Sequence, residues 1–74
     1  MANPLAEHYA EMLLERISRD TYPSGTQMDM LESIAPPELL VRYILHLMDR
    51  IEEEQYPSVD MMRRLHRLIV GFGT

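Results

Sequence analysis

Three histidines, His8, His46 and His66, are the side chains of this sequence best suited to binding a metal ion or moving a proton. His8 with Glu11, and His46 with Asp49, stand three residues apart, so each pair could share a metal ion from one helix face. A zinc site, however, needs three or four converging ligands, and a di-iron bundle needs a glutamate three residues before each histidine. Neither pattern occurs, so we expect surface histidines and no metal centre.

Motifs for covalent catalysis and for phosphate binding are also missing from the sequence. No serine lies in a Gly-x-Ser-x-Gly elbow, and two serines, Ser24 and Ser58, are better explained as helix caps. The segment Gly71–Gly73 does not join a strand to a helix, as a glycine-rich phosphate loop would. We therefore expect a protein that is not an enzyme and that uses neither a cofactor nor a metal.

The composition is typical of one small globular domain. The chain has 74 residues, of which 46% are apolar and 26% charged, and it contains no cysteine that could form a disulfide. Apolar runs such as Leu39–Val41 are far too short to span a membrane, and the first residues lack the basic and apolar regions of a signal peptide. These observations predict a single cytoplasmic domain over residues 1–74.

The charges are distributed unevenly. The net charge of −5 argues against nucleic-acid binding, which favours an excess of basic residues. Arg63, Arg64 and Arg67, with His66 between them, nevertheless form the one basic cluster, and it follows an acidic run, Glu52–Glu54. The three arginines are candidate contacts for an anion or a partner. They leave open an alternative function, a weak nucleic-acid-binding or regulatory protein.

The sequence matches itself when it is shifted by 34 positions, which indicates an internal duplication. Ten pairs are identical between residues 5–34 and 39–68, and the alignment needs no gap. The identical pairs are Leu5/Leu39, Tyr9/Tyr43, Leu13/Leu47, Arg16/Arg50, Ile17/Ile51, Tyr22/Tyr56, Pro23/Pro57, Ser24/Ser58, Met28/Met62 and Leu31/Leu65. The predicted fold is all-α: a small four-helix bundle made of two tandem αα-hairpin repeats, at about residues 3–35 and 37–70.

Each repeat is predicted to contain a helix, a Tyr-Pro-Ser turn and a second helix, with helices at about 4–20, 25–34, 37–54 and 59–70. Asn3 is the expected cap of the first helix, and Pro4 suits its first turn. An apolar residue every four positions, at Leu5, Tyr9, Leu13 and Ile17, predicts the buried face of that helix. Gly71 and Gly73 are expected to end the last helix.

The repeated turns, Tyr22–Pro23–Ser24 and Tyr56–Pro57–Ser58, have a structural explanation. Proline ends one helix, serine caps the next, and tyrosine is expected to pack into the corner between them. Gln27, three residues after Ser24, predicts a capping box. The alternative is that the two tyrosines mark a ligand site.

The third predicted helix is apolar nearly all round, unlike the first. Val41 and Leu45 stand where the first repeat has Glu7 and Glu11. Such a helix is buried on more than one side, either at the centre of the monomer or against a second chain. We expect a homodimer in which this helix meets itself across a two-fold axis. The candidate self-association or partner face consists of Val41, Ile44, Leu45 and Met48.

Methionine is abundant, and flexible methionine side chains fill irregular cores or line adaptable binding surfaces. Met28 and Met62 occupy equivalent positions and are expected in the core, whereas Met30 and Met61 are candidate exposed partner contacts. Together, the observations predict a non-enzymatic helical protein–protein interaction module or small adaptor subunit. Its partner is a protein that the sequence does not identify.

Overall fold

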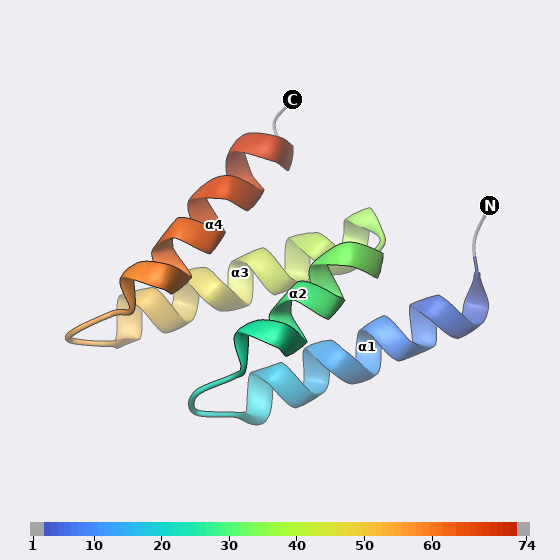
Figure 1. Ribbon diagram of the computed structural model, residues 1–74, viewed down its shortest axis with the longest axis horizontal. Helices are drawn as coiled ribbons and strands as arrows, with labels where there is room; N and C mark the ends of the chain where they lie inside the picture. The colour runs from blue at the N-terminus through green and yellow to red at the C-terminus, as the bar shows by residue number, and fades with distance from the viewer. Residues whose placement is uncertain (1–2, 73–74) are drawn as a thin grey trace. The chain divides into compact units, whose positions relative to one another are not determined.

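The computed structural model describes residues 3–72, and within them the only regular secondary structure is α-helix (Figure 1). The helices are α1 (Pro4–Arg19), α2 (Gly25–Ile34), α3 (Pro37–Glu53) and α4 (Val59–Phe72). The predicted all-helical class is confirmed, and the predicted helix boundaries are accurate to within two residues. The chain divides into two compact units, Met1–Val41 and Arg42–Thr74, with the division inside α3.

Helix α1 begins as the sequence predicts. The Asn3 side chain accepts hydrogen bonds from the backbone N–H groups of Leu5 (3.1 Å) and Ala6 (3.3 Å). These two N–H groups have no carbonyl partner within the helix, so the asparagine oxygen replaces one. The helix ends at Asp20, whose N–H donates to the Arg16 carbonyl at 3.2 Å.

Both short helices begin with the same serine cap. Ser24 Oγ accepts a hydrogen bond from the N–H of Gln27 at 3.0 Å, and Ser58 Oγ accepts one from the N–H of Met61 at 3.2 Å. The serine carbonyls accept the first helical hydrogen bond of each helix, both at 3.1 Å. The predicted capping box is wrong, because Gln27 Oε1 is buried without a hydrogen-bond partner among the described residues and does not reach back to Ser24.

The prediction that tyrosine packs into each turn is also wrong. Tyr22 is 87% exposed and Tyr56 is 84% exposed. The proline and the serine are sufficient to end one helix and begin the next, so the turn forms without a buried ring. The turns lie where the chain reverses between α1 and α2 and between α3 and α4 (Figure 1).

Helix α4 runs past the predicted stop. Gly71 lies within the helix, which continues to Phe72, and the other predicted stop, Gly73, lies outside the described residues. The backbone of Gly71 has no positive φ angle, so the position does not have the left-handed conformation that ends many helices. Helix α2 ends at Ile34 because Pro36 and Pro37 follow it, whereas the aligned residues of α4 are Val70 and Gly71, which can continue a helix.

In the first unit, α1 and α2 pack against each other, and each contributes buried side chains. The buried residues are Ala10, Leu14 and Ile17 on α1, and Met28 and Leu31 on α2. Most of the predicted stripe is therefore wrong, because Leu5 and Tyr9 are exposed and Leu13 is half-buried. A four-residue step exceeds one helical turn by about 40°, so the stripe winds around α1 and only its end reaches the buried face.

The second unit buries fewer side chains than the first. Its part of α3 contributes Tyr43, Ile44 and Leu47 as buried side chains. Helix α4 has no buried residue, although its apolar side chains Met61, Leu65 and Leu68 are half-buried. None of the described helices is long and apolar enough to cross a membrane.

Candidate interaction surfaces

An apolar stripe on α3 remains exposed. Val41 is 40% exposed, Leu45 54% and Met48 37%. Their spacing of four and then three residues places them on one side of the helix. Tyr43 and Leu47, which point elsewhere on the same helix, are fully buried. Helix α3 is thus a core helix on one side and carries unburied apolar surface on another.

Ile44 does not belong to this exposed stripe. The structure places it among the buried side chains of α3, so three of the four residues of the predicted face are accessible. Ile44 follows Tyr43 by about 100° around the helix, and both lie within the arc that is covered. The accessible residues, Val41, Leu45 and Met48, are called the α3 stripe below.

The α3 stripe ends in negative charge. Glu52 stands four residues after Met48, close to the line of the stripe, and the acidic run Glu52–Glu54 is exposed throughout. A second acidic residue, Glu38, lies exposed in the first turn of α3. The apolar stripe is therefore bordered by carboxylates at both ends, as a polar rim borders many protein interfaces.

The three arginines of α4 differ in their exposure. Arg63 and Arg67 stand one turn apart and are exposed, whereas Arg64, three residues before Arg67, is half-buried. Arg63 Nη1 lies 4.0 Å from Asp60 Oδ1, with both side chains almost fully in solvent. An exposed pair of this length contributes little to stability and leaves Arg63 accessible. Binding of an anion by these residues stays a prediction.

The burial of the four methionines on α2 and α4 differs from the prediction. Met28 is buried, as expected for a core residue, but its equivalent Met62 is exposed. Met30 is exposed and Met61 is half-buried. On α4 the exposed apolar side chains also include Val59, Ile69, Val70 and Phe72.

The histidines lie apart from one another in the chain, on three different helices. Within residues 3–72, no group of three or more histidine and carboxylate side chains is placed to hold a metal ion. His46 is half-buried, and burial lowers its pKa below the usual 6.5, with the neighbouring Arg50 guanidinium acting in the same direction. The His46 imidazole therefore takes up a proton less readily than an unperturbed histidine.

No protein-family model, curated protein or solved structure is significantly similar to this chain. The surfaces must therefore be interpreted from their own chemistry.

A groove in the first unit was missed by the sequence reasoning. It has a volume of about 420 Å³ and lies beside α1, with one contribution from α2. Its lining residues are Tyr9, Met12, Leu13, Glu15, Arg16, Arg19 and Gln27. Two of these, Tyr9 and Leu13, belong to the stripe that the sequence predicts as the buried face of the helix. The signal that could have located the groove is the spacing of Leu5, Tyr9, Met12 and Arg16, an exposed apolar stripe that ends in a cation.

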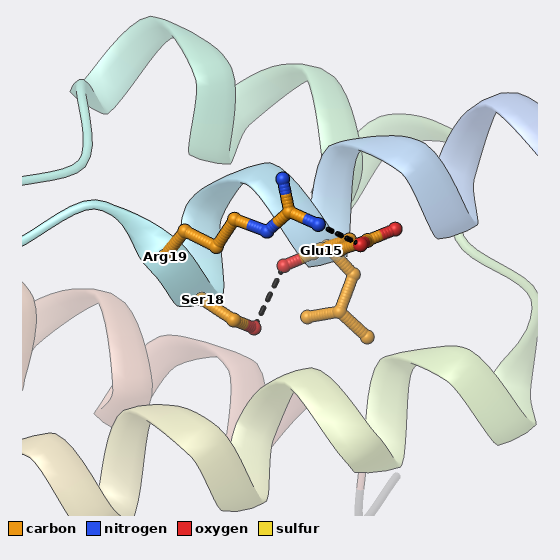
Figure 2. Close-up of polar contacts among 4 residues, drawn as sticks. Glu15, Ser18 and Arg19 are labelled. Carbon is orange, nitrogen blue, oxygen red and sulfur yellow. Dashed lines mark hydrogen bonds and ion pairs between the residues drawn. The ribbon is translucent and has the colours of Figure 1, made fainter.

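Polar contacts along α1 set the charge of this groove. Arg19 pairs with Glu15 one turn earlier, and Figure 2 shows the two side chains meeting on the surface of α1. Ser18 Oγ donates to the Leu14 carbonyl at 2.8 Å, on a different side of the helix from that ion pair (Figure 2). Arg19 is thus paired with Glu15, whereas no ion pair engages the Arg16 guanidinium among the described residues.

Proposed function

We propose that this protein is a non-enzymatic interaction module that associates with a second copy of itself through the α3 stripe. The observation that carries the proposal is the exposure of Val41, Leu45 and Met48 on a helix whose other side carries the fully buried Tyr43 and Leu47. Removing such side chains from water stabilises an interface by about 25 cal/mol for each Å² of apolar surface. A two-fold pairing of α3 with α3 would bury the stripe of both copies at once.

The first repeat offers an internal comparison for this surface. Glu7 and Glu11 occupy the positions equivalent to Val41 and Leu45, and both glutamates are exposed. Solvent-exposed helix positions are normally charged, as they are in the first repeat. The replacement of charge by aliphatic side chains at two exposed positions of one stripe supports a role in binding rather than in folding.

We also propose that the two hairpins are copies of one 34-residue unit. Ten identical pairs of residues and the matching serine caps at Ser24 and Ser58 support this relationship. The absence of cysteine suits a reducing compartment, and we propose a cytoplasmic location for the module. If no second copy occupies the α3 stripe, another protein is its proposed partner, and the chain then acts as an adaptor subunit.

The solution mass tests the proposal. Sedimentation should give a dimer for the wild type and a folded monomer for the double variant Val41→Glu/Leu45→Glu, which restores the charges of the first repeat. Leu5→Glu is the matched control, because it places the same charge at an exposed leucine on α1. It should remain dimeric. Far-UV circular dichroism establishes that each variant is folded.

Other outcomes are equally informative. A monomeric wild type with a folded double variant rejects self-association and leaves the stripe as a site for a different protein. A monomeric wild type whose double variant unfolds rejects the interface altogether, because the stripe would then be required for folding. Dissociation by Leu5→Glu alone would place the contact on α1 instead of α3.

A further inference from the structure

The groove beside α1 carries an inference that is independent of self-association, because none of its lining residues belongs to the α3 stripe. We propose that it binds the free carboxyl terminus of a peptide that ends in an apolar residue. Three kinds of group line the groove: an accessible guanidinium, a buried hydrogen-bond acceptor, and an apolar wall. A C-terminal residue carries a complementary group for each of these on one Cα atom. Its carboxylate suits the guanidinium, its amide N–H suits the acceptor, and its side chain suits the apolar wall.

The guanidinium is that of Arg16. Residues 1–41 contain seven carboxylates and only two arginines, Arg16 and Arg19, and both arginines line this groove. Arg19 is paired with Glu15, whereas no side-chain hydrogen bond or ion pair engages Arg16 among the described residues. An arginine fork binds a carboxylate through two parallel hydrogen bonds. In an otherwise acidic unit, Arg16 is therefore the group to which we expect an anion to bind.

The acceptor is Gln27 Oε1, which is inaccessible to solvent and has no hydrogen-bond partner within residues 3–72. A buried carbonyl oxygen without a donor is unfavourable, and a ligand that supplies an N–H group relieves it. The backbone of Gln27 is held by the Ser24 cap at 3.0 Å, so this side chain starts from a fixed point at the beginning of α2. The amide N–H of a terminal peptide residue can supply the missing donor once the Gln27 side-chain amide turns toward the groove that it lines.

The apolar wall consists of Tyr9, Met12 and Leu13. Tyr9 and Met12 are exposed, so a bound aliphatic or aromatic side chain would remove both from water. The volume of about 420 Å³ lies at the small end of the range for ligand sites, which suits a short terminal segment better than a folded surface. A phosphate group would satisfy Arg16 alone and would leave the apolar wall uncovered.

Titration with short peptides tests the proposal. The probes are acetylated tripeptides, acetyl-Gly-Ala-X, with X as Leu, Met, Phe or Val, each prepared with a free carboxylate and as the C-terminal amide. Binding is followed by backbone NMR shifts of the full-length protein. At least one free acid should bind, with shifts centred on α1 and the start of α2. Its amide should bind roughly tenfold or more weakly, because the charge-assisted bond is lost.

Variants assign the roles. Arg16→Gln should abolish the preference for the free acid, and Gln27→Leu should weaken the acid and the amide alike, since it removes the acceptor for the backbone N–H. Arg67→Gln is the matched control, because it removes one exposed arginine from α4, and it should leave binding unchanged.

The proposal is overturned if no peptide shifts the spectrum at roughly 10 mM, if acid and amide bind equally, or if Arg67→Gln reduces binding as much as Arg16→Gln. Because the α3 stripe is intact in all these variants, loss of peptide binding and loss of self-association are distinguishable by measuring the solution mass of the same samples.

Discussion

Leu5 and Leu39 align when the sequence is shifted by 34 positions, yet Leu5 is 81% exposed and Leu39 is 4% exposed. The next equivalent pair behaves in the same way, because Tyr9 is exposed and Tyr43 is fully buried. The positions on the other side of the helix show the reverse, since Leu14 is buried and Met48 is exposed. Helices α1 and α3 therefore bury different sides, although their sequences are identical at five aligned positions.

This comparison separates local from non-local causes. The caps at Ser24 and Ser58 have the same geometry because each hydrogen bond joins groups three residues apart and needs nothing from the rest of the chain. The buried side of a helix depends instead on the segments that cover it, which can lie far away along the chain. Equivalent residues thus give equivalent turns but not an equivalent core.

The largest expected effect tests the difference in burial directly. Leu39→Ala should lower the free energy of unfolding by about 2–5 kcal/mol, because it leaves a cavity at a buried site. The equivalent Leu5→Ala should change it by less than about 0.5 kcal/mol. Urea denaturation followed by circular dichroism measures both values. If the two variants lost the same free energy of unfolding, the difference in burial between Leu5 and Leu39 would be contradicted.

Unlike the two leucine variants, the two serine-cap variants should lose equal amounts of stability. Ser24→Ala and Ser58→Ala should each cost about 1 kcal/mol, since each leaves a backbone N–H without its side-chain acceptor. Thermal unfolding of the two variants, with Ser33→Ala as a control at an exposed serine inside α2, checks this expectation. A clear difference between the caps would mean that the turns are not equivalent in energy.

A substitution at Gly71 tests why α4 extends further than α2. Gly71→Ala should stabilise the protein by about 0.5–1 kcal/mol, because alanine restricts the unfolded chain and favours helix. A Cβ atom at this position meets nothing within 4 Å, so no steric cost offsets the gain. Chemical denaturation provides the value. Destabilisation by alanine would mean that the end of α4 requires the flexibility of glycine.

The smallest expected effect concerns the half-buried His46, which aligns with the exposed Met12 of α1. Burial, and then Arg50, lower the pKa of His46 in the folded state. The unfolded chain then binds a proton more readily than the folded chain, so stability is lost as the pH falls through about 6.5. The decrease in melting temperature between about pH 7.5 and 5.5 should be smaller in His46→Gln than in the wild type. Identical decreases would show that His46 does not contribute.

Much of the local structure could be predicted because its causes are short in range. Asn3, Pro23, Pro57 and the two serines specify where helices begin and end through contacts within one turn. The exposure of Tyr22 and Tyr56 could not be predicted in this way, because nothing in a turn motif says whether a neighbouring element covers its tyrosine. Of the candidate surfaces, the α3 stripe was predictable from the comparison of the two repeats.

The amino-acid sequence by itself determined the helices, the turns and the unusual apolar character of α3, since these follow from residue types at fixed spacings. Only the tertiary structure decided that Val41 faces solvent while Tyr43 is covered, and that Arg16 and Gln27, from two different helices, line the same groove. The physical reason is the same in both cases. An amphipathic pattern specifies which side chains share a side of a helix, but the packing of distant segments determines which side is removed from water.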